Sequence, residues 1–181
     1  MQAQLARIEE DLQRAEERLR QMARGLTLEQ WLHAPGPGCW TAAACVEHLN
    51  LTAEAMLPRL REGLEKARQL GRPAPRRLSM GLVGWMIWKG SGPTSRARIR
   101  TTAAFEPAAV PAPAELLERF HCLQDEQVAC LRDARGLPLD RVRMISPFKE
   151  SMSYNLYTGF RLLPAHQHRH LRQAEEALAT W

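Results

Sequence analysis

The sequence predicts an all-α protein: a four-helix bundle with a long crossover that carries a short extra helix between helices two and three. Four long segments repeat apolar residues at the 3.6-residue period of a helix with one buried face. No segment matches the alternation of apolar and polar residues that a half-buried strand shows. The length of 181 residues suits one hydrophobic core. We therefore expect a single bundle domain over residues 1–181.

The first quarter of the chain predicts one long helix, a short turn and a loop. Residues 2–23 place apolar side chains at helical spacing among charges, and Gly25 ends that helix. Thr27, with a glutamine three residues later, predicts the capped start of a short turn through Leu32. Two prolines and two glycines make residues 33–40, HAPGPGCW, a loop.

The second long helix and the crossover come next. Thr41 is the expected N-cap of a helix that runs to about Leu70, and Pro58 inside it should produce a kink. Residues 71–113 are rich in proline and glycine and form the crossover. Within it, residues 78–90 are apolar enough to be a short helix over the core.

The third and fourth long helices complete the bundle. Residues 113–134 form the third helix by their apolar period. The segment DRVRMISPF, residues 140–148, is expected to be a short ordered connection. The fourth helix should run from about Ser153 to Thr180.

Composition limits the classes of function. The formal net charge is +5 and the sequence pI is about 9.4, so the surface is moderately basic. The arginines are interspersed with alanine, proline and leucine and form no recognition motif, so nucleic acid is not an expected partner. No apolar run of about 20 residues predicts a membrane span. The charged amino terminus is unlike a signal peptide. The four cysteines form no CxxC pair or disulfide framework, which favours a reducing cytoplasmic location.

Candidate chemistry is concentrated in residues 163–178, LPAHQHRHLRQAEEAL. At about 100° per residue, His166 and His170 lie about 40° apart and one turn along the helix. Two imidazoles at this spacing can converge on one metal ion. His168 points away from this pair and is expected to be solvated. Gln173 returns to the side of His166, where it could hydrogen-bond a ligand or metal-bound water, and it is the candidate for orienting a bound nucleophile.

A third ligand must come from another helix, and His48 in TAAACVEHLNL is the candidate. It lies on the flank of an apolar stripe, whereas Glu47 is expected to face outward. Cys45 shares the face of His48 and is a less favoured ligand. Three imidazoles would leave coordination positions open, as in catalytic metal sites. The alternative is that these are hydrogen-bonded core histidines, because sequence alone does not show that helices two and four meet.

Three segments resemble a known family. GCWTAAACVEHLN and AHQHRHLRQ resemble the two signatures of the DinB-like superfamily, and DRVRMISPF resembles the segment that connects to its last helix. The resemblance covers nearly the whole chain in the same order. It implies a three-histidine metal site inside a four-helix bundle, with His48, His166 and His170 as ligands. Imidazole ligands suit a divalent ion, zinc or nickel first, with iron(II) and copper also compatible.

Two function classes remain open, and the resemblance implies the first of them. One is an enzyme with a small-molecule substrate: a metal-dependent transferase that uses a low-molecular-weight thiol, or a hydrolase. The sequence shows no general base near the site, which favours a thiol because thiols ionise more readily than water. Trp85 and Trp88 of the crossover are expected to roof the pocket. The other class is a non-catalytic, stress-related binder of a metal or ligand, with the apolar crossover as the contact surface of a homodimer. The crossover also holds three alternating arginines that could bind an anionic substrate or face solvent: Arg96, Arg98 and Arg100.

Overall fold

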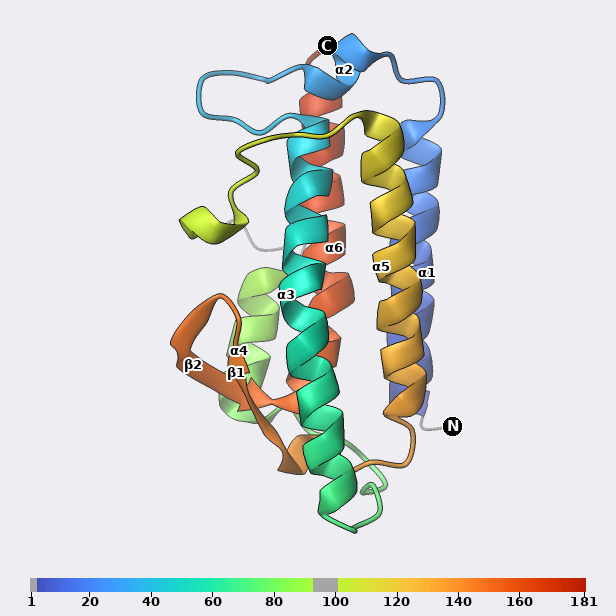
Figure 1. The fold of residues 1–181 in the computed structure, drawn as a ribbon, viewed down its shortest axis with the longest axis vertical. Coiled ribbons are helices and arrows are strands. Elements are labelled where there is room, and N and C mark those ends of the chain that lie inside the picture. Colours follow the sequence, from blue (N-terminus) through green and yellow to red (C-terminus); the bar gives the residue numbers. More distant parts are fainter. Residues whose placement is uncertain (1–2, 93–100) are drawn as a thin grey trace.

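Four long helices dominate the computed structural model, which describes residues 3–92 and 101–181 (Figure 1). The crossover arginines at positions 96, 98 and 100 lie outside the described residues. The long helices are α1 (Ala3–Ala23), α3 (Ala42–Gln69), α5 (Pro113–Asp133) and α6 (Leu156–Leu178). The all-α class predicted from helical periodicity is confirmed.

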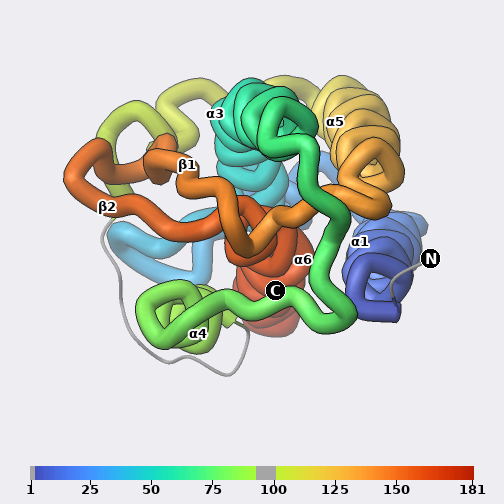
Figure 2. The backbone as a smooth tube through the Cα atoms, turned by 90° about the horizontal axis from the view of Figure 1, so that it is seen from below, coloured from blue at the N-terminus to red at the C-terminus, as the bar shows by residue number. Residues whose placement is uncertain are grey.

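The four long helices pack as a ring around a shared core. Helix α3 contacts α5 and α6, and α1 contacts the same two helices from the opposite side (Figure 2). Leu12, Leu60 and Phe160, from three different helices, are completely buried in this core. The apolar stripe of each helix faces its neighbours, because burial of apolar surface is the main stabilising contribution to the bundle.

Local signals place the helix ends near the expected residues. The Thr41 hydroxyl accepts a hydrogen bond from the Ala44 amide and caps α3. Gly25 adopts φ +74° just after α1, a conformation that glycine tolerates best. The short helix α2 (Leu28–Leu32) begins with the expected capping box at Thr27. Helix α3 continues through Pro58 without an interruption.

A β-hairpin precedes α6, which corrects the expectation that the chain contains no strand and that the last helix begins at Ser153. Strand β1 (Arg143–Ser146) pairs antiparallel with β2 (Lys149–Asn155), and α6 begins only at Leu156. Burial alternates along β1, but hydrophobicity does not. Ile145 is 49% exposed and Ser146 is 2% exposed, so the apolar side chain faces solvent and the polar one faces inward. A period-2 search on hydrophobicity therefore misses this strand.

The crossover from α3 to α5 carries the expected short helix, α4 (Gly81–Ser91), and a 3-10 turn, η1 (Ala103–Phe105), that the sequence did not indicate. Helix α4 packs closely on α6. A Cβ atom built on Gly84 would lie 2.2 Å from the Thr158 hydroxyl oxygen. A second 3-10 turn, η2 (Leu139–Arg141), leads into the hairpin.

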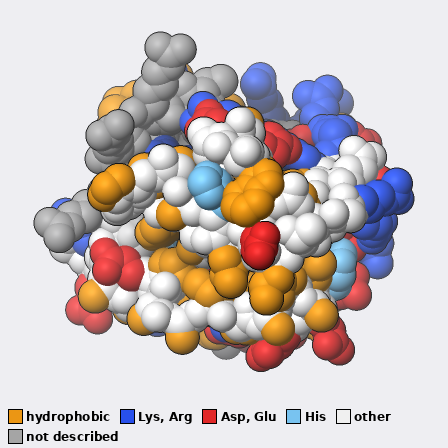
Figure 3. All heavy atoms as spheres, turned by 90° about the horizontal axis from the view of Figure 1, so that it is seen from above, with side chains coloured by type: hydrophobic (Ala, Val, Ile, Leu, Met, Phe, Trp, Pro, Cys, Tyr) orange, Lys and Arg blue, Asp and Glu red, His pale blue; other side chains and the backbone are white. Residues whose placement is uncertain are grey.

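The surface carries charges of both signs. At the end of the bundle where the chain terminates, basic side chains gather along one edge with acidic ones beside them (Figure 3). On α1, for example, Arg20 forms ion pairs with Glu16 and Glu17. No helix in the described part of the chain is both long enough and apolar enough to cross a membrane.

Candidate metal centre

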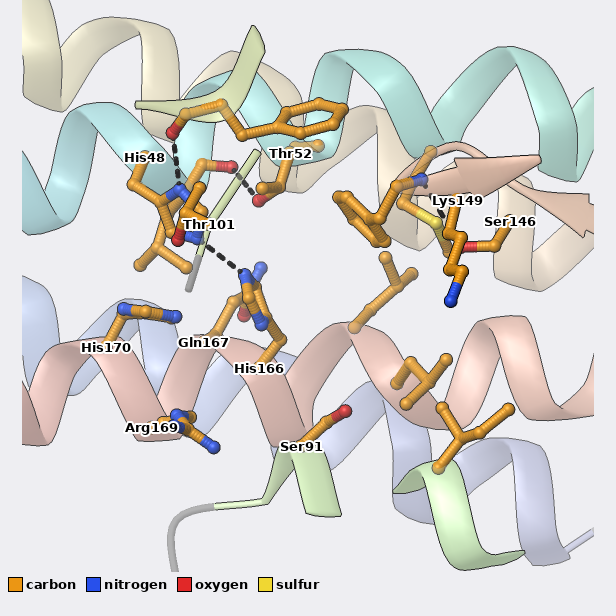
Figure 4. Close-up of a pocket in the computed structure, with 18 of the residues that line it drawn as sticks. His48, Thr52, Ser91, Thr101, Ser146, Lys149, His166, Gln167, Arg169 and His170 are labelled. Carbon is orange, nitrogen blue, oxygen red and sulfur yellow. Dashed lines mark hydrogen bonds between the residues drawn. The ribbon is translucent and has the colours of Figure 1, made fainter. Parts of the chain in front are cut away.

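Three imidazoles from two helices meet inside the bundle. His48 on α3 faces His166 and His170 on α6, and one nitrogen of each ring lies within 4.8 Å of the others (Figure 4). The Nε2 atoms of His48 and His166 are 3.2 Å apart. Nitrogen ligands at about 2.0–2.1 Å from a tetrahedral ion are about 3.3 Å from one another, so this group could hold one metal ion.

Two of the rings are held from behind by hydrogen-bond acceptors. The Nδ1 atom of His48 lies 2.8 Å from the carbonyl oxygen of Phe105, and Nδ1 of His170 lies 3.1 Å from Oε1 of Gln173. Because these oxygens accept hydrogen bonds, each Nδ1 carries the proton and each Nε2 keeps a lone pair. The amide oxygen of Gln173 thus contacts His170, whereas the helical period predicted that it would face the His166 side.

Burial keeps the three rings uncharged. Burial lowers the pKa of His170 to about 3, with the nearby His48 adding to the effect. Burial lowers the pKa of His48 as well, opposed by its hydrogen bond to Phe105. Burial, followed by the proximity of the other two imidazoles, holds the pKa of His166 well below its ordinary value. At neutral pH the nitrogens are therefore free of excess protons, which a metal ion requires.

An aromatic side chain covers one side of the histidine group. The ring of Trp40 lies 4.9 Å from that of His48 and 5.9 Å from that of His170, measured between centroids. Trp40 is the last residue of the loop of residues 33–40, so this loop contributes one side chain beside the histidines. Trp40 belongs to the segment GCWTAAACVEHLN, but no role was predicted for this side chain.

A cavity of about 450 Å³ extends from the histidines between α3, α4, α6 and the hairpin (Figure 4). Its walls are mostly apolar. No aspartate or glutamate occurs among the cavity-lining residues that the structure describes. The principal apolar contributors come from all four elements: Leu49, Met56, Ile87, Phe148, Tyr154 and Leu162.

Two residues near the predicted ligands differ from expectation. His168 does point away from the histidine group, but it is half-buried, and its Nδ1 atom lies 3.4 Å from the Arg18 guanidinium on α1. Glu47 is 5% exposed rather than solvated, because Arg119 on α5 forms an ion pair with it at 2.9 Å. Arg18 and Arg119 belong to other helices, and a projection of one helix does not show where the other helices lie.

The less favoured ligand, Cys45, lies outside the histidine group. It is buried, and burial raises the pKa of its thiol to about 12. The thiolate that a metal requires is therefore disfavoured. Nδ1 of His121 on α5 lies 3.0 Å from Oε1 of Glu16, and His121 is not part of the group of three histidines.

The crossover contributes to the cavity through residues other than those predicted. Met86 and Ile87 of α4 line the cavity, and Trp85 and Trp88 do not. Trp85 is 44% exposed, and Trp88 packs against the Arg161 guanidinium, 4.7 Å from the ring centroid. The apolar character of this helix was evident in the sequence, but the side facing the bundle was not.

Comparison with known proteins gives one result. The family model described as the DinB superfamily matches residues 11–174, a range that contains all three histidines. Neither a curated protein nor a solved structure matches the chain significantly. The match agrees with the resemblance seen in the two histidine-containing segments.

Proposed function

Because the chain belongs to the DinB superfamily, we propose that it is a metal-dependent transferase that joins a low-molecular-weight thiol to a small-molecule substrate. His48, His166 and His170 are the proposed ligands of one divalent ion, zinc or nickel first, with iron(II) and copper also compatible. The observation that carries the proposal is the position of three neutral imidazoles at one end of an apolar cavity.

A bound divalent ion would lower the pKa of a thiol beside it and supply a nucleophile at neutral pH. The protein's own groups prepare this site. Phe105 and Gln173 fix the orientation of two imidazoles, and a substrate that filled the apolar cavity would displace water from the reacting atoms. The described cavity lining holds no carboxylate that could act as a general base. A thiol needs less help than water to ionise, which favours thiol transfer over hydrolysis.

The test is turnover with a metal-stripped and a reloaded protein. A panel of low-molecular-weight thiols would be combined with an aromatic chloride as the acceptor, and chloride release would be followed. We expect conversion that depends on the ion and falls at least 100-fold in His48→Ala. His121→Ala changes a histidine outside the group and should retain the metal-dependent conversion. Metal-dependent ester cleavage without thiol transfer would identify a hydrolase, and the absence of both reactions would overturn the enzyme proposal.

One observation favours the alternative, a non-catalytic metal- or ligand-binding dimer. Helix α4 exposes a row of apolar side chains, with Leu82 73%, Val83 54% and Met86 51% exposed. Such surfaces often mark contacts with a partner. Sedimentation equilibrium of the wild type and of Leu82→Glu separates the two functions. A dimer that dissociates in the variant, together with no metal-dependent turnover, would favour the alternative.

A further inference from the structure

The cavity beside the histidines is large enough to hold a small organic molecule. Its volume of about 450 Å³ falls within the range of about 300–1,000 Å³ that is usual for small-molecule sites. Figure 4 shows the histidine group at one end and Ser146 and Lys149 at the other, with apolar side chains between them. A ligand that fills this space must therefore present an apolar body to the middle of the cavity.

The apolar walls are adaptable. Met56, Met86 and Met152 line the cavity from three different elements. Methionine side chains are unbranched and rotate easily, so they can fit ligands of different shapes. Phe105 and Phe148 add an edge-to-face aromatic pair with centroids 4.9 Å apart. This lining favours hydrocarbon, aliphatic or aromatic, without imposing one rigid outline.

Charge narrows the ligand class further. The charged residues in the described lining are Lys149 and Arg169, which are both cationic. Lys149 lies at the end away from the histidines, and Arg169 lies on the histidine side (Figure 4). With no carboxylate in the described lining, an ammonium group on the ligand would have no counter-ion. A neutral or anionic ligand meets no such cost.

We propose that this cavity binds the acceptor substrate as a neutral or anionic molecule with an extended apolar body. The body lies between α3 and α6 and points toward the hairpin, and the reactive end lies at the histidines. The identity of the reactive end rests on the proposed function. The apolar binding does not, because the walls that supply it belong to the protein alone.

The first experiment measures binding of linear alcohols of six to twelve carbons by calorimetry, with chelator-treated and metal-loaded protein. We expect affinity to rise by about fourfold for each added methylene until the cavity is full. Both forms of the protein should show this increase. With chelator-treated protein, a twelve-carbon carboxylate should bind at least tenfold more tightly than the trimethylammonium compound of equal length. Equal affinities of these two would overturn the charge assignment.

A matched pair of variants locates the binding. Ala53 lines the cavity, so the larger side chain of Ala53→Leu should fill part of it. The variant should bind the longest alcohol at least tenfold more weakly, and its affinity should stop rising at a shorter chain length. Ala55 lies on the same helix but outside the cavity lining, and Ala55→Leu should bind like the wild type. Far-UV circular dichroism would verify that both variants fold.

Methyl-labelled methionine provides a readout that needs no variant. Addition of an alcohol should shift the NMR signals of Met56, Met86 and Met152, while Met22, which packs in a separate part of the core, should not move. No shift at the lining methionines, or no dependence of affinity on chain length, would overturn the proposal.

The outcomes separate this proposal from the proposed function. Alcohol binding in a protein that shows no metal-dependent turnover would support the apolar site and contradict the transferase. Metal-dependent turnover in a protein that binds none of the alcohols would support the transferase and overturn the apolar site.

Discussion

The ring of His170 has one nitrogen held by a neighbouring side chain and one that could bind a metal ion. Its Nδ1 atom contacts Gln173, and its other nitrogen belongs to the histidine group. We expect His170→Ala to lose stoichiometric zinc or nickel, because two remaining imidazoles hold an ion poorly. His168→Ala should keep about one equivalent, since that ring faces Arg18 on α1. Metal content by mass spectrometry after purification checks this, and equal loss in both variants would contradict the assignment of ligands.

Gln173 should strengthen metal binding without being a ligand. Its amide oxygen fixes the proton of His170 on Nδ1, so Gln173→Leu should weaken metal binding by about 10- to 100-fold. Gln173→Glu can still accept the hydrogen bond and should restore most of the affinity. Competition with a chromophoric chelator measures both. Wild-type affinity in Gln173→Leu would show that the contact does not support the site.

At the residue scale, the sequence predicted which histidines share a face but not what surrounds them. The spacing of His166 and His170 fixes their direction on a helix, and the structure brings His48 to them. The carbonyl of Phe105, which orients His48, belongs to the crossover and is a backbone group. No side-chain pattern encodes such a partner. Burial of Glu47 depends in the same way on Arg119 from another helix.

At the scale of elements, Gly84 allows helix α4 to pack closely against α6. A Cβ atom on Gly84 would meet the Thr158 hydroxyl at 2.2 Å and Cβ of Thr158 at 3.2 Å, and this side chain is fixed by a hydrogen bond to Asn155. We expect Gly84→Ala to reduce the free energy of unfolding by about 1–3 kcal/mol, as overpacking does. It should also move the cavity wall. Chemical denaturation and the binding of a ten-carbon alcohol measure these effects.

Gly90 on the same helix is the matched control. A Cβ atom there meets nothing within 4 Å, so Gly90→Ala should be neutral or stabilising by up to about 1 kcal/mol. Equal destabilisation by the two substitutions would mean that helix α4 is not held by close approach to α6. An unchanged stability of Gly84→Ala would carry the same meaning.

Elements with strong periodicity were predictable, and those fixed by tertiary contacts were not. The long helices follow from apolar stripes and caps, for example at Thr41. The hairpin was not predicted, because the apolar Ile145 is exposed and the polar Ser146 is buried. Helix α4 was expected from its composition, but its inward side depends on the approach of Gly84 to α6.

For the whole molecule, the histidine group is held within a bundle whose core is apolar on both sides of it. One cluster of buried side chains contains Leu60 and Phe160, and another contains Leu49 and Leu171. These clusters consist of apolar side chains, so the bundle should stay folded when a chelator removes any bound ion. The helical signal in circular dichroism should therefore be the same before and after treatment.

The uncharged histidines should nevertheless make the stability of the metal-stripped protein depend on pH. Burial lowers the pKa of His170 from 6.5 to about 3, so between these values the unfolded chain binds a proton that the folded protein does not. The free energy of unfolding must then fall as the pH falls below 6.5, by up to about 1.4 kcal/mol per pH unit for this residue. The lowered pKa values of His48 and His166 act in the same direction. Urea unfolding at pH 7, 6 and 5 measures this slope.

A pair of substitutions on α6 tests whether the buried imidazoles cause the change of the free energy of unfolding with pH. His170→Gln removes one titrating ring and should make the loss of stability between pH 7 and 5 shallower. Leu171→Val shortens a fully buried neighbour and should lower stability at every pH while leaving the slope unchanged. If both variants kept the wild-type slope, the acid sensitivity would belong to other groups. A shallower slope in His170→Gln alone would mean that the bundle loses stability in acid by keeping its candidate ligands unprotonated, the form that binds a metal ion.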